Sequence, residues 1–129
     1  MRTFEEIKDT VEAGLGKHPC DLKLANVRLV NVWSSEIYPT DIHIRRGRVV
    51  SIDPRAGLEA LETVDCGGQY AVPGLIDTHM HFETTMLSPE ALASVVVPAG
   101  STTLCADLME IANVAGAAGL KAMLTSMDR

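Results

Sequence analysis

Two histidines stand one residue apart in an otherwise apolar segment, VPGLIDTHMHFETTM, residues 72–86. Side chains alternate between the two faces of a strand, so Asp77, His79 and His81 project to one side if this segment is extended. The two imidazoles then lie about 7 Å apart along the strand and can converge on one cation. A metal gives each buried ring nitrogen a partner, which offsets the loss of hydration. The spacing therefore indicates a metal site, with two histidines hydrogen-bonded in a polar loop as the alternative.

The segments that surround the histidines alternate between strand and helix patterns. A short strand begins at LID, residues 75–77, and ends at the histidines, and a helix follows with Ser88 as its N-cap and Pro89 as its first residue. GSTTLCADL is a β-branched apolar run suited to a buried parallel strand, and EIANVAGAAGLKAMLTSM is Ala-rich and helical. Residues 71–129 are therefore expected to form two βα units.

The first part of the chain has a different pattern. Thr3 and Glu6 have the spacing of a capping box, and apolar residues then recur at helical intervals until Gly14 and Gly16, which predicts a helix and linker over residues 1–20. Residues 21–70 are rich in strand formers separated by Asn, Ser, Pro and Gly. Within them, DIHIRRGRVVSI alternates across an Arg-Gly turn, which predicts a hairpin with one covered face.

Composition limits the classes of function. The 129 residues are 47% hydrophobic and 22% charged with a formal charge of −6, and this is typical of a chain that builds a core. The Lys and Arg residues are scattered, which argues against binding to nucleic acid or an anionic membrane and favours small-molecule or protein partners. No apolar run reaches the roughly 20 residues that span a bilayer. Cys20, Cys66 and Cys105 are expected to be buried or half-buried thiols in a reducing cytoplasm. His18 and His43 are isolated, so surface or hairpin positions are expected for both.

The number of strands sets a further expectation. Two βα units supply two parallel strands, whereas a closed (β/α)₈ barrel takes roughly 250 residues. We therefore expect a fragment, a truncated gene product or one part of a split protein. The apolar strand from Thr102 to Ala106 should then be exposed on at least one edge or face.

The motif PGLIDTHMH resembles the first-strand signature of the amidohydrolase superfamily, metal-dependent hydrolases whose catalytic barrel is flanked by a small β-rich domain. The longer segment HMHFETTMLSPEALASVVVPAGSTTLCADLMEIANVAG resembles adenine deaminases. This resemblance covers essentially the whole chain but only the N-terminal portion of the family's length. It implies an α/β fold: an N-terminal helix, part of a small composite β-sandwich (residues 21–70), and the first two βα units of an amidohydrolase-type (β/α)₈ barrel (residues 71–129).

The resemblance also implies roles for individual residues. His79 and His81 would be ligands of a divalent metal, Mn, Fe or Zn, and Glu83 is the candidate catalytic residue. Glu83 shares the face of the histidines if the strand geometry persists, and a solvated loop carboxylate is the alternative. Asp77, Asp107 and Glu110 would orient the metal ligands from a second layer, with helix capping as the alternative for the last two.

The chain departs from the family pattern at one place. Adenine deaminases usually have Asp-Pro-His-Glu after the second strand, where this chain has Asp107, Leu108, Met109 and Glu110. Methionine cannot transfer a proton and is a poor ligand for hard metals. Met109 therefore cannot do what the family histidine does.

The implied reaction is the hydrolytic deamination of adenine to hypoxanthine and ammonia, so a purine base is the expected partner. Because a catalytic metal has about three protein ligands and the chain offers two histidines, the isolated chain is expected to show low activity. It would form a homo-oligomer or associate with a complementing C-terminal chain. Two alternatives stay open: a non-catalytic remnant or interaction module, and another cyclic amide or amidine hydrolase of the superfamily.

Overall fold

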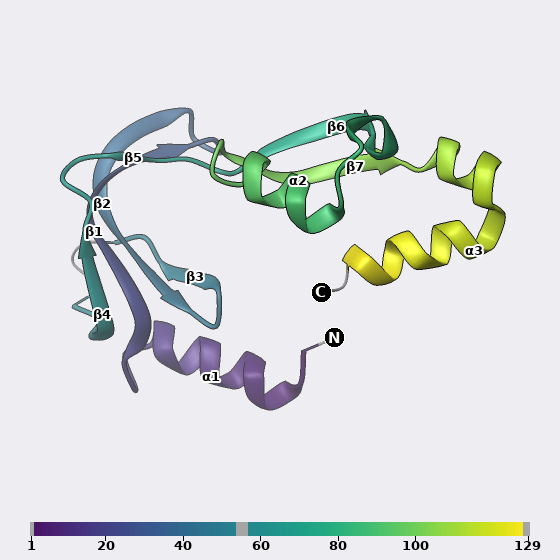
Figure 1. Cartoon of the computed structure of the whole chain (residues 1–129). Helices are drawn as coiled ribbons and strands as arrows, with labels where there is room; N and C mark the ends of the chain where they lie inside the picture. Colours follow the sequence, from purple (N-terminus) through teal and green to yellow (C-terminus); the bar gives the residue numbers. More distant parts are fainter. Residues whose placement is uncertain (1, 54–56, 128–129) are drawn as a thin grey trace. The chain divides into compact units, whose positions relative to one another are not determined.

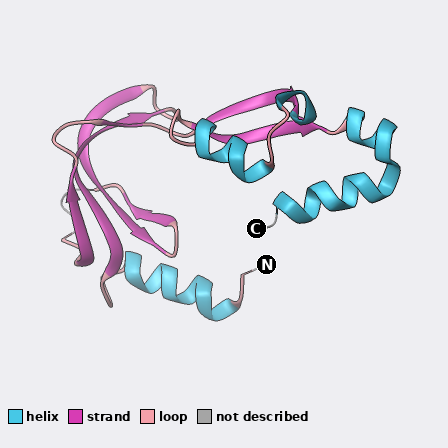
Figure 2. Cartoon of the chain, in the orientation of Figure 1, coloured by secondary structure: helices cyan, strands magenta, loops and turns pink. Residues whose placement is uncertain are grey.

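The computed structural model describes residues 2–53 and 57–127, which form two compact units. The N-terminal unit, Met1–Pro73, consists mainly of strands, whereas the C-terminal unit, Gly74–Arg129, combines strands with helices (Figure 2). The predicted α/β class is therefore confirmed.

The N-terminal unit begins with helix α1, Phe4–Gly14, which starts at the predicted capping box. The Thr3 hydroxyl accepts a hydrogen bond from the Glu6 backbone N–H, and the Glu6 carboxylate accepts one from the Thr3 N–H at 2.9 Å. An ion pair ties the helix to the sheet, because the Asp9 carboxylate contacts the Arg45 guanidinium at 2.8 Å. The same guanidinium reaches Asp21 on the first strand.

One mixed sheet makes up the rest of this unit (Figure 1). Its strands are β1 (Cys20–Asn31), β2 (Glu36–Arg45), β3 (Arg48–Ser51), β4 (Ala60–Asp65) and β5 (Tyr70–Ala71). The order is β3-β2-β1-β4, and β5 also pairs with β1. Strands β2 and β3 form the predicted hairpin around Arg46 and Gly47, which both have positive φ. Strands β4 and β5 run parallel to β1.

His43 lies in the β2–β3 hairpin, as expected, but it is not at the surface. Its side chain is among the most deeply buried in the described residues, with 1% of its surface exposed, and its neighbour Ile42 is buried as well. Two consecutive buried residues mean that both faces of β2 are covered here, whereas the sequence pattern predicted one covered face. Burial lowers the pKa of His43, with the Lys23 charge acting in the same direction, so the imidazole is held neutral.

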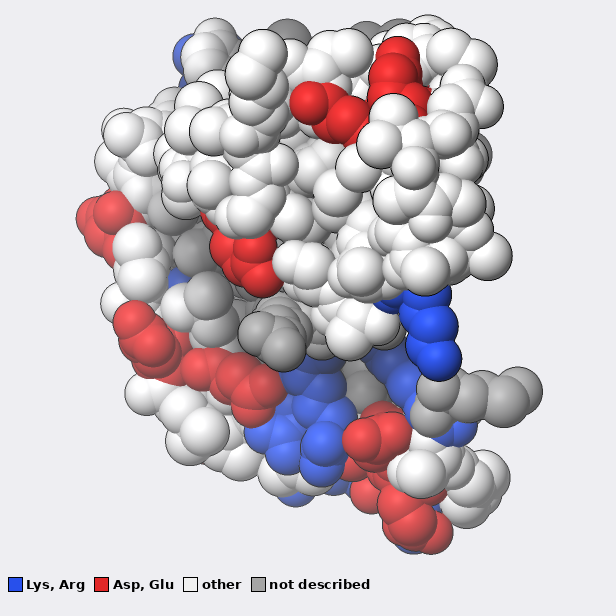
Figure 3. Space-filling model, turned by 45° about the vertical axis from the view of Figure 1, so that its right-hand side comes forward, with Lys and Arg blue, Asp and Glu red and all other residues white. Residues whose placement is uncertain are grey.

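Basic and acidic side chains are mixed on the surface drawn in Figure 3, where Lys and Arg lie next to Asp and Glu. Lys23 contacts Asp41 at 2.7 Å, and Lys17 contacts Glu12 at 3.1 Å. Among the described residues, no helix is long and apolar enough to cross a bilayer.

The C-terminal unit has the order strand, helix, strand, helix. Its elements are β6 (Leu75–His81), the 3₁₀ helix η1 (Phe82–Thr85), α2 (Pro89–Val96), β7 (Ser101–Asp107) and α3 (Met109–Met127). Strands β6 and β7 pair in parallel, as expected for successive βα units. The Ser88 hydroxyl caps α2 by accepting from the Ala91 N–H at 3.2 Å.

Strand β7 is far less buried than a central barrel strand. Most of its residues are exposed, so the expected exposure of the 102–106 strand is confirmed. The expectation of a buried or half-buried thiol is wrong for Cys105, which is exposed, whereas Cys20 is buried and Cys66 is half-buried. A sheet of two strands gives neither strand neighbours on both sides, so apolar sequence alone does not bury β7.

Helix α3 is not the single helix that its Ala-rich sequence predicts. It bends at Gly116, where φ is 57° and ψ is −151°, values that no helical residue adopts (Figure 1). Gly119 then approaches Ile111 and Ala115 so closely that an added Cβ would overlap the Ala115 side chain. Two glycines therefore divide this segment into two short helices that pack against each other.

Candidate metal centre

Strand β6 brings His79 and His81 together at its C-terminal end. The two ring centroids are 5.2 Å apart, and the ring planes are nearly perpendicular at 88°. His79 is exposed and His81 is half-buried. Both imidazoles therefore lie on one side of the strand end, within reach of a single ion.

Glu110 contacts His81 from the start of α3. Its Oε2 lies 3.2 Å from Nδ1 of the imidazole, across 29 residues of sequence. The parallel ladder explains this meeting, because it places His81 opposite Asp107 and Glu110 follows three residues later, in the first turn of α3. The structure thus brings this acidic residue to the histidine pair.

Glu83 is not on the strand, so the geometry on which its expected position depended is not present. The chain turns into η1 directly after His81, and Oε1 of Glu83 accepts a hydrogen bond from the Ile111 N–H at 3.0 Å. Its Oε2 is buried without a hydrogen-bond partner in the described part of the chain. Burial raises the pKa of Glu83, but the Ile111 N–H and other donors outweigh this, and the pKa falls below its usual value. The lowered pKa keeps the group a carboxylate, and its Oε1 is bound to the start of α3.

Neither Asp77 nor Asp107 is hydrogen-bonded to an imidazole among the described residues. Asp77 Oδ1 accepts from the His79 backbone N–H at 3.1 Å, which is a local turn interaction rather than a contact with the imidazole. The β6–β7 register is irregular between Asp77 and Met80, so the strict alternation expected from the sequence is interrupted. Asp107 ends β7 and is exposed. Met109, at the first position of α3, is half exposed.

The donor set fits part of a metal site. Two imidazoles and a buried, unpartnered carboxylate oxygen are the donors that divalent transition metals take. Within residues 2–53 and 57–127, however, no group of three His, Cys, Asp or Glu side chains is placed to hold an ion. The described residues therefore bring two imidazoles together with carboxylates near them, which is less than a complete metal site.

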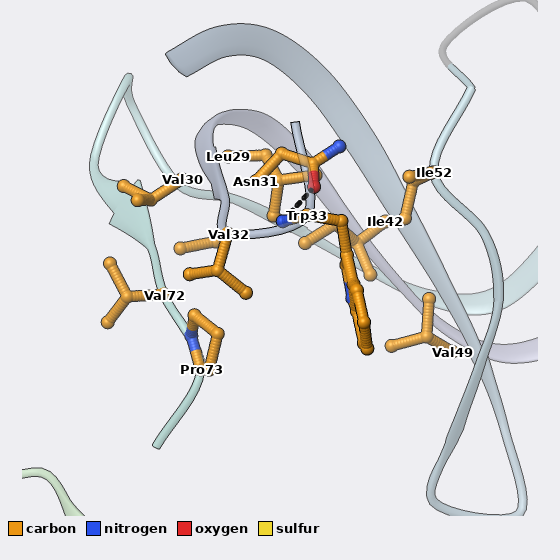
Figure 4. Close-up of a pocket in the computed structure, with 11 residues that line it drawn as sticks. Leu29, Val30, Asn31, Val32, Trp33, Ile42, Val49, Ile52, Val72 and Pro73 are labelled. Carbon is orange, nitrogen blue, oxygen red and sulfur yellow. Dashed lines mark hydrogen bonds between the residues drawn. The ribbon is translucent and has the colours of Figure 1, made fainter. Parts of the chain in front are cut away.

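A cavity of about 360 Å³ lies in the N-terminal unit, away from the histidine pair in the sequence (Figure 4). Its lining is apolar apart from Asn31, whose side-chain oxygen accepts from the Trp33 N–H at 3.0 Å. This cavity was not predicted from the sequence, although the apolar residues Val30, Val32 and Trp33 lie around the end of β1. A lining without acids, bases or thiols gives it no catalytic chemistry.

The chain is similar to known proteins over most of its length. The amidohydrolase family model matches residues 70–129. The chain is 44% identical over 122 residues to an adenine deaminase from Desulforamulus reducens and 43% identical over 122 residues to one from Kosmotoga olearia. Both matches cover 95% of this chain and 21% of the relative.

A solved structure is also similar. The L-hydantoinase (dihydropyrimidinase) from Arthrobacter aurescens aligns with a TM-score of 0.50 and 30% identity, over 66% of this chain and 20% of that one. The chain spans about a fifth of the length of the curated relatives that it matches. Over the residues that it spans, the chain is thus similar to adenine deaminases, and its residues 70–129 match the amidohydrolase family.

Proposed function

We propose that this chain forms part of an adenine deaminase that converts adenine and water to hypoxanthine and ammonia. The observation that carries the proposal is the perpendicular pair of imidazoles, His79 and His81, at the end of β6, in a chain over 40% identical to adenine deaminases. The purine base is the substrate because the relatives are named for it.

A divalent metal, Mn, Fe or Zn, is part of the proposal, with His79 and His81 as its ligands. When bound, such an ion activates water as a nucleophile at neutral pH. The mixed nitrogen and oxygen donors suit all three metals, so the ligand types do not select among them. The remaining ligands would come from sequence that the relatives have beyond the matched fifth.

The acidic residues divide into two groups. Glu83 is the candidate catalytic residue, because its Oε2 is buried and lacks a partner in the described residues, so this oxygen is available to accept or return a proton. Asp77, Asp107 and Glu110 are the candidates for orienting the ligands, and among the described residues Glu110 is the one of these whose side chain contacts an imidazole. Met109 replaces the family histidine and leaves a proton-transfer or binding role to another group.

The architecture of the whole protein follows from the family. Residues 21–70 would be part of the composite β-sandwich, residues 71–129 would begin the (β/α)₈ barrel, and residues 1–20 would form the helix and linker before them. The exposed strand β7 supports association with a second copy or a complementing C-terminal chain. Three cysteines without a disulfide among the described residues support a cytoplasmic location.

The test combines metal binding with turnover. The purified chain, His79→Ala/His81→Ala and the matched control His18→Ala are each loaded with Mn²⁺, Fe²⁺ or Zn²⁺, and bound metal and hypoxanthine release are measured. We expect the chain and the control to bind metal with little turnover, and the double variant to lose binding.

Complementation then separates the alternatives. Adding the unmatched remainder of the Desulforamulus reducens relative should raise deamination, and only with intact histidines. If the complemented protein hydrolyses a cyclic amide but not adenine, the chain is part of another cyclic amide or amidine hydrolase of the superfamily. Neither binding nor turnover in any form would identify a non-catalytic remnant.

A further inference from the structure

We propose that Glu110 is a positioning residue that fixes the imidazole of His81 with the proton on Nδ1, and that Glu83 holds Glu110 in place through the first turn of α3. The inference rests on the proposed metal-ligand role of His81, but it concerns the apo protein first. It assigns to Glu110 one function, orientation of a ligand, rather than contact with substrate or metal.

The proton position follows from the chemistry of the pair. Oε2 of Glu110 lies 3.2 Å from Nδ1 of His81. An ionised carboxylate only accepts hydrogen bonds, so Nδ1 must be the donor. In a neutral imidazole the lone pair then resides on Nε2, which is the atom left to bind an ion. A carboxylate behind the ring thus selects both the orientation of the ligand and its binding atom.

Glu83 completes a two-point connection between the end of β6 and the start of α3. Its Oε1 accepts from the N–H of Ile111, the residue that follows Glu110, at 3.0 Å. One hydrogen bond therefore runs from residue 110 back to residue 81, and the other from residue 111 back to residue 83. We call this pair of interactions the carboxylate clasp. Because α3 is held at Ile111, the Glu110 side chain loses fewer conformations when it binds His81.

The clasp has a measurable consequence for metal affinity. Removal of a carboxylate that orients a metal-binding histidine typically costs about 10–100-fold in affinity. Glutamine at position 110 keeps an oxygen that accepts from Nδ1, so Glu110→Gln should retain much of what Glu110→Ala loses. Glu83→Ala should weaken binding by a smaller factor, because it loosens the clasp without removing the contact to the ring.

The first readout needs no metal. Long-range ¹H–¹⁵N spectra of the chain at about pH 8 report which nitrogen of each of its four histidines carries the proton, and a His81→Ala sample assigns the signal. We expect Nδ1 to be protonated in the unmodified chain and in Glu110→Gln, and a mixture of both tautomers in Glu110→Ala. The matched control is Glu90→Ala, which removes a carboxylate of the same unit that accepts a hydrogen bond from the Ser126 hydroxyl at 3.2 Å.

The second readout is titration with Mn²⁺ alone of the unmodified chain, Glu110→Gln, Glu110→Ala and Glu90→Ala, and also of Glu83→Ala, which should lose less affinity than Glu110→Ala. Affinity should fall about 10–100-fold in Glu110→Ala, less in Glu110→Gln, and not at all in Glu90→Ala. Protonation of Nε2 in the unmodified chain, or equal tautomers and affinities in all of the proteins measured, would overturn the inference and leave the proposed function standing. Absence of Mn²⁺ binding in every protein, with the tautomer change intact, would refute the metal role instead and confirm the contact between Glu110 and His81.

Discussion

The two units are stabilised in different ways. In the N-terminal unit, the described core contains Ala13, Cys20, Val27, Ile42 and His43, and ion pairs join its helix to its sheet. In the C-terminal unit, only Phe82 and Leu92 are buried among the described apolar residues, and the sheet has two strands. Its polar contacts instead gather at the histidine end, where the clasp joins β6 and η1 to α3.

The larger buried core and the candidate site therefore lie in different units. The N-terminal unit buries Thr40 and His43 in its core, whereas the C-terminal unit brings Glu83 and Glu110 to its histidine end. Substitutions should therefore affect one unit at a time, and hydrogen exchange measured for the peptides of each unit can show it.

Gly74→Ala should have the largest effect and should act on the C-terminal unit alone. A Cβ at residue 74 would overlap the side chain of Thr102 on β7, at the place where Leu75 begins the ladder. We expect a loss of about 3 kcal/mol of stability in this unit, the upper range for overpacking. Hydrogen exchange should accelerate across β6 and β7. Thr102→Ala in the same protein should restore part of the loss, and equal acceleration in both units would break the comparison.

Gly116→Ala should be next in size. The φ and ψ of this residue lie in a region that is essentially restricted to glycine, and alanine there costs about 2 kcal/mol. We expect faster exchange in α3 and no change in the N-terminal unit. Circular dichroism provides a second measurement. A gain in helicity and in thermal stability would show that the bend is not set by the glycine backbone.

The N-terminal unit should lose stability on acidification through His43. Burial lowers the pKa of this imidazole in the folded state, with Lys23 lowering it further and Asp41 opposing the shift. Below about pH 6.5 the unfolded chain takes up a proton that the folded chain excludes, so stability present above this pH is lost as the pH falls, at up to about 1.4 kcal/mol per pH unit. Urea unfolding between pH 8 and pH 5 measures the slope. His43→Leu should flatten it and the control His18→Gln should not.

Thr3→Ala should have the smallest effect. It removes the hydroxyl that accepts from the Glu6 N–H at the start of α1, which costs about 1 kcal/mol. Amide hydrogen exchange of residues 4–14 should become faster, whereas the amides of β6 and β7 should stay protected. Thr3→Ser keeps the hydroxyl and serves as the control. An equal loss of stability in Thr3→Ala and Thr3→Ser would show that the missing hydroxyl cap is not its cause.

Local patterns in the sequence predicted the elements well. The capping box at Thr3 and Glu6, the N-cap Ser88 and the hairpin around Gly47 depend on residues within a few positions of each other, and each is present in the structure. The histidine pair was likewise found from a spacing of two. Such features are encoded by backbone geometry that repeats every two to four residues.

Features that depend on contacts between distant residues were not predicted. His43 is buried because both faces of β2 are covered at this point. The alternation of apolar and polar residues in 41–52 indicates only one covered face. Glu83 lies off the strand because a 3₁₀ helix starts directly after His81. The expectation that Glu83 shares the face of the histidines assumed that the strand continued to residue 83. The bend in α3 requires a Gly conformation that helix propensity does not describe, since propensity assigns Gly116 a cost but not an angle.

The exposed thiol of Cys105 has a practical consequence. Cys20 is buried, so a maleimide reagent under native conditions should modify Cys105 in preference to it, and Cys66→Ser would leave a single accessible attachment point. A dye or spin label attached there would sit on β7, in the unit that carries the histidines. A change in the signal of such a label would therefore report when another copy or another chain covers β7.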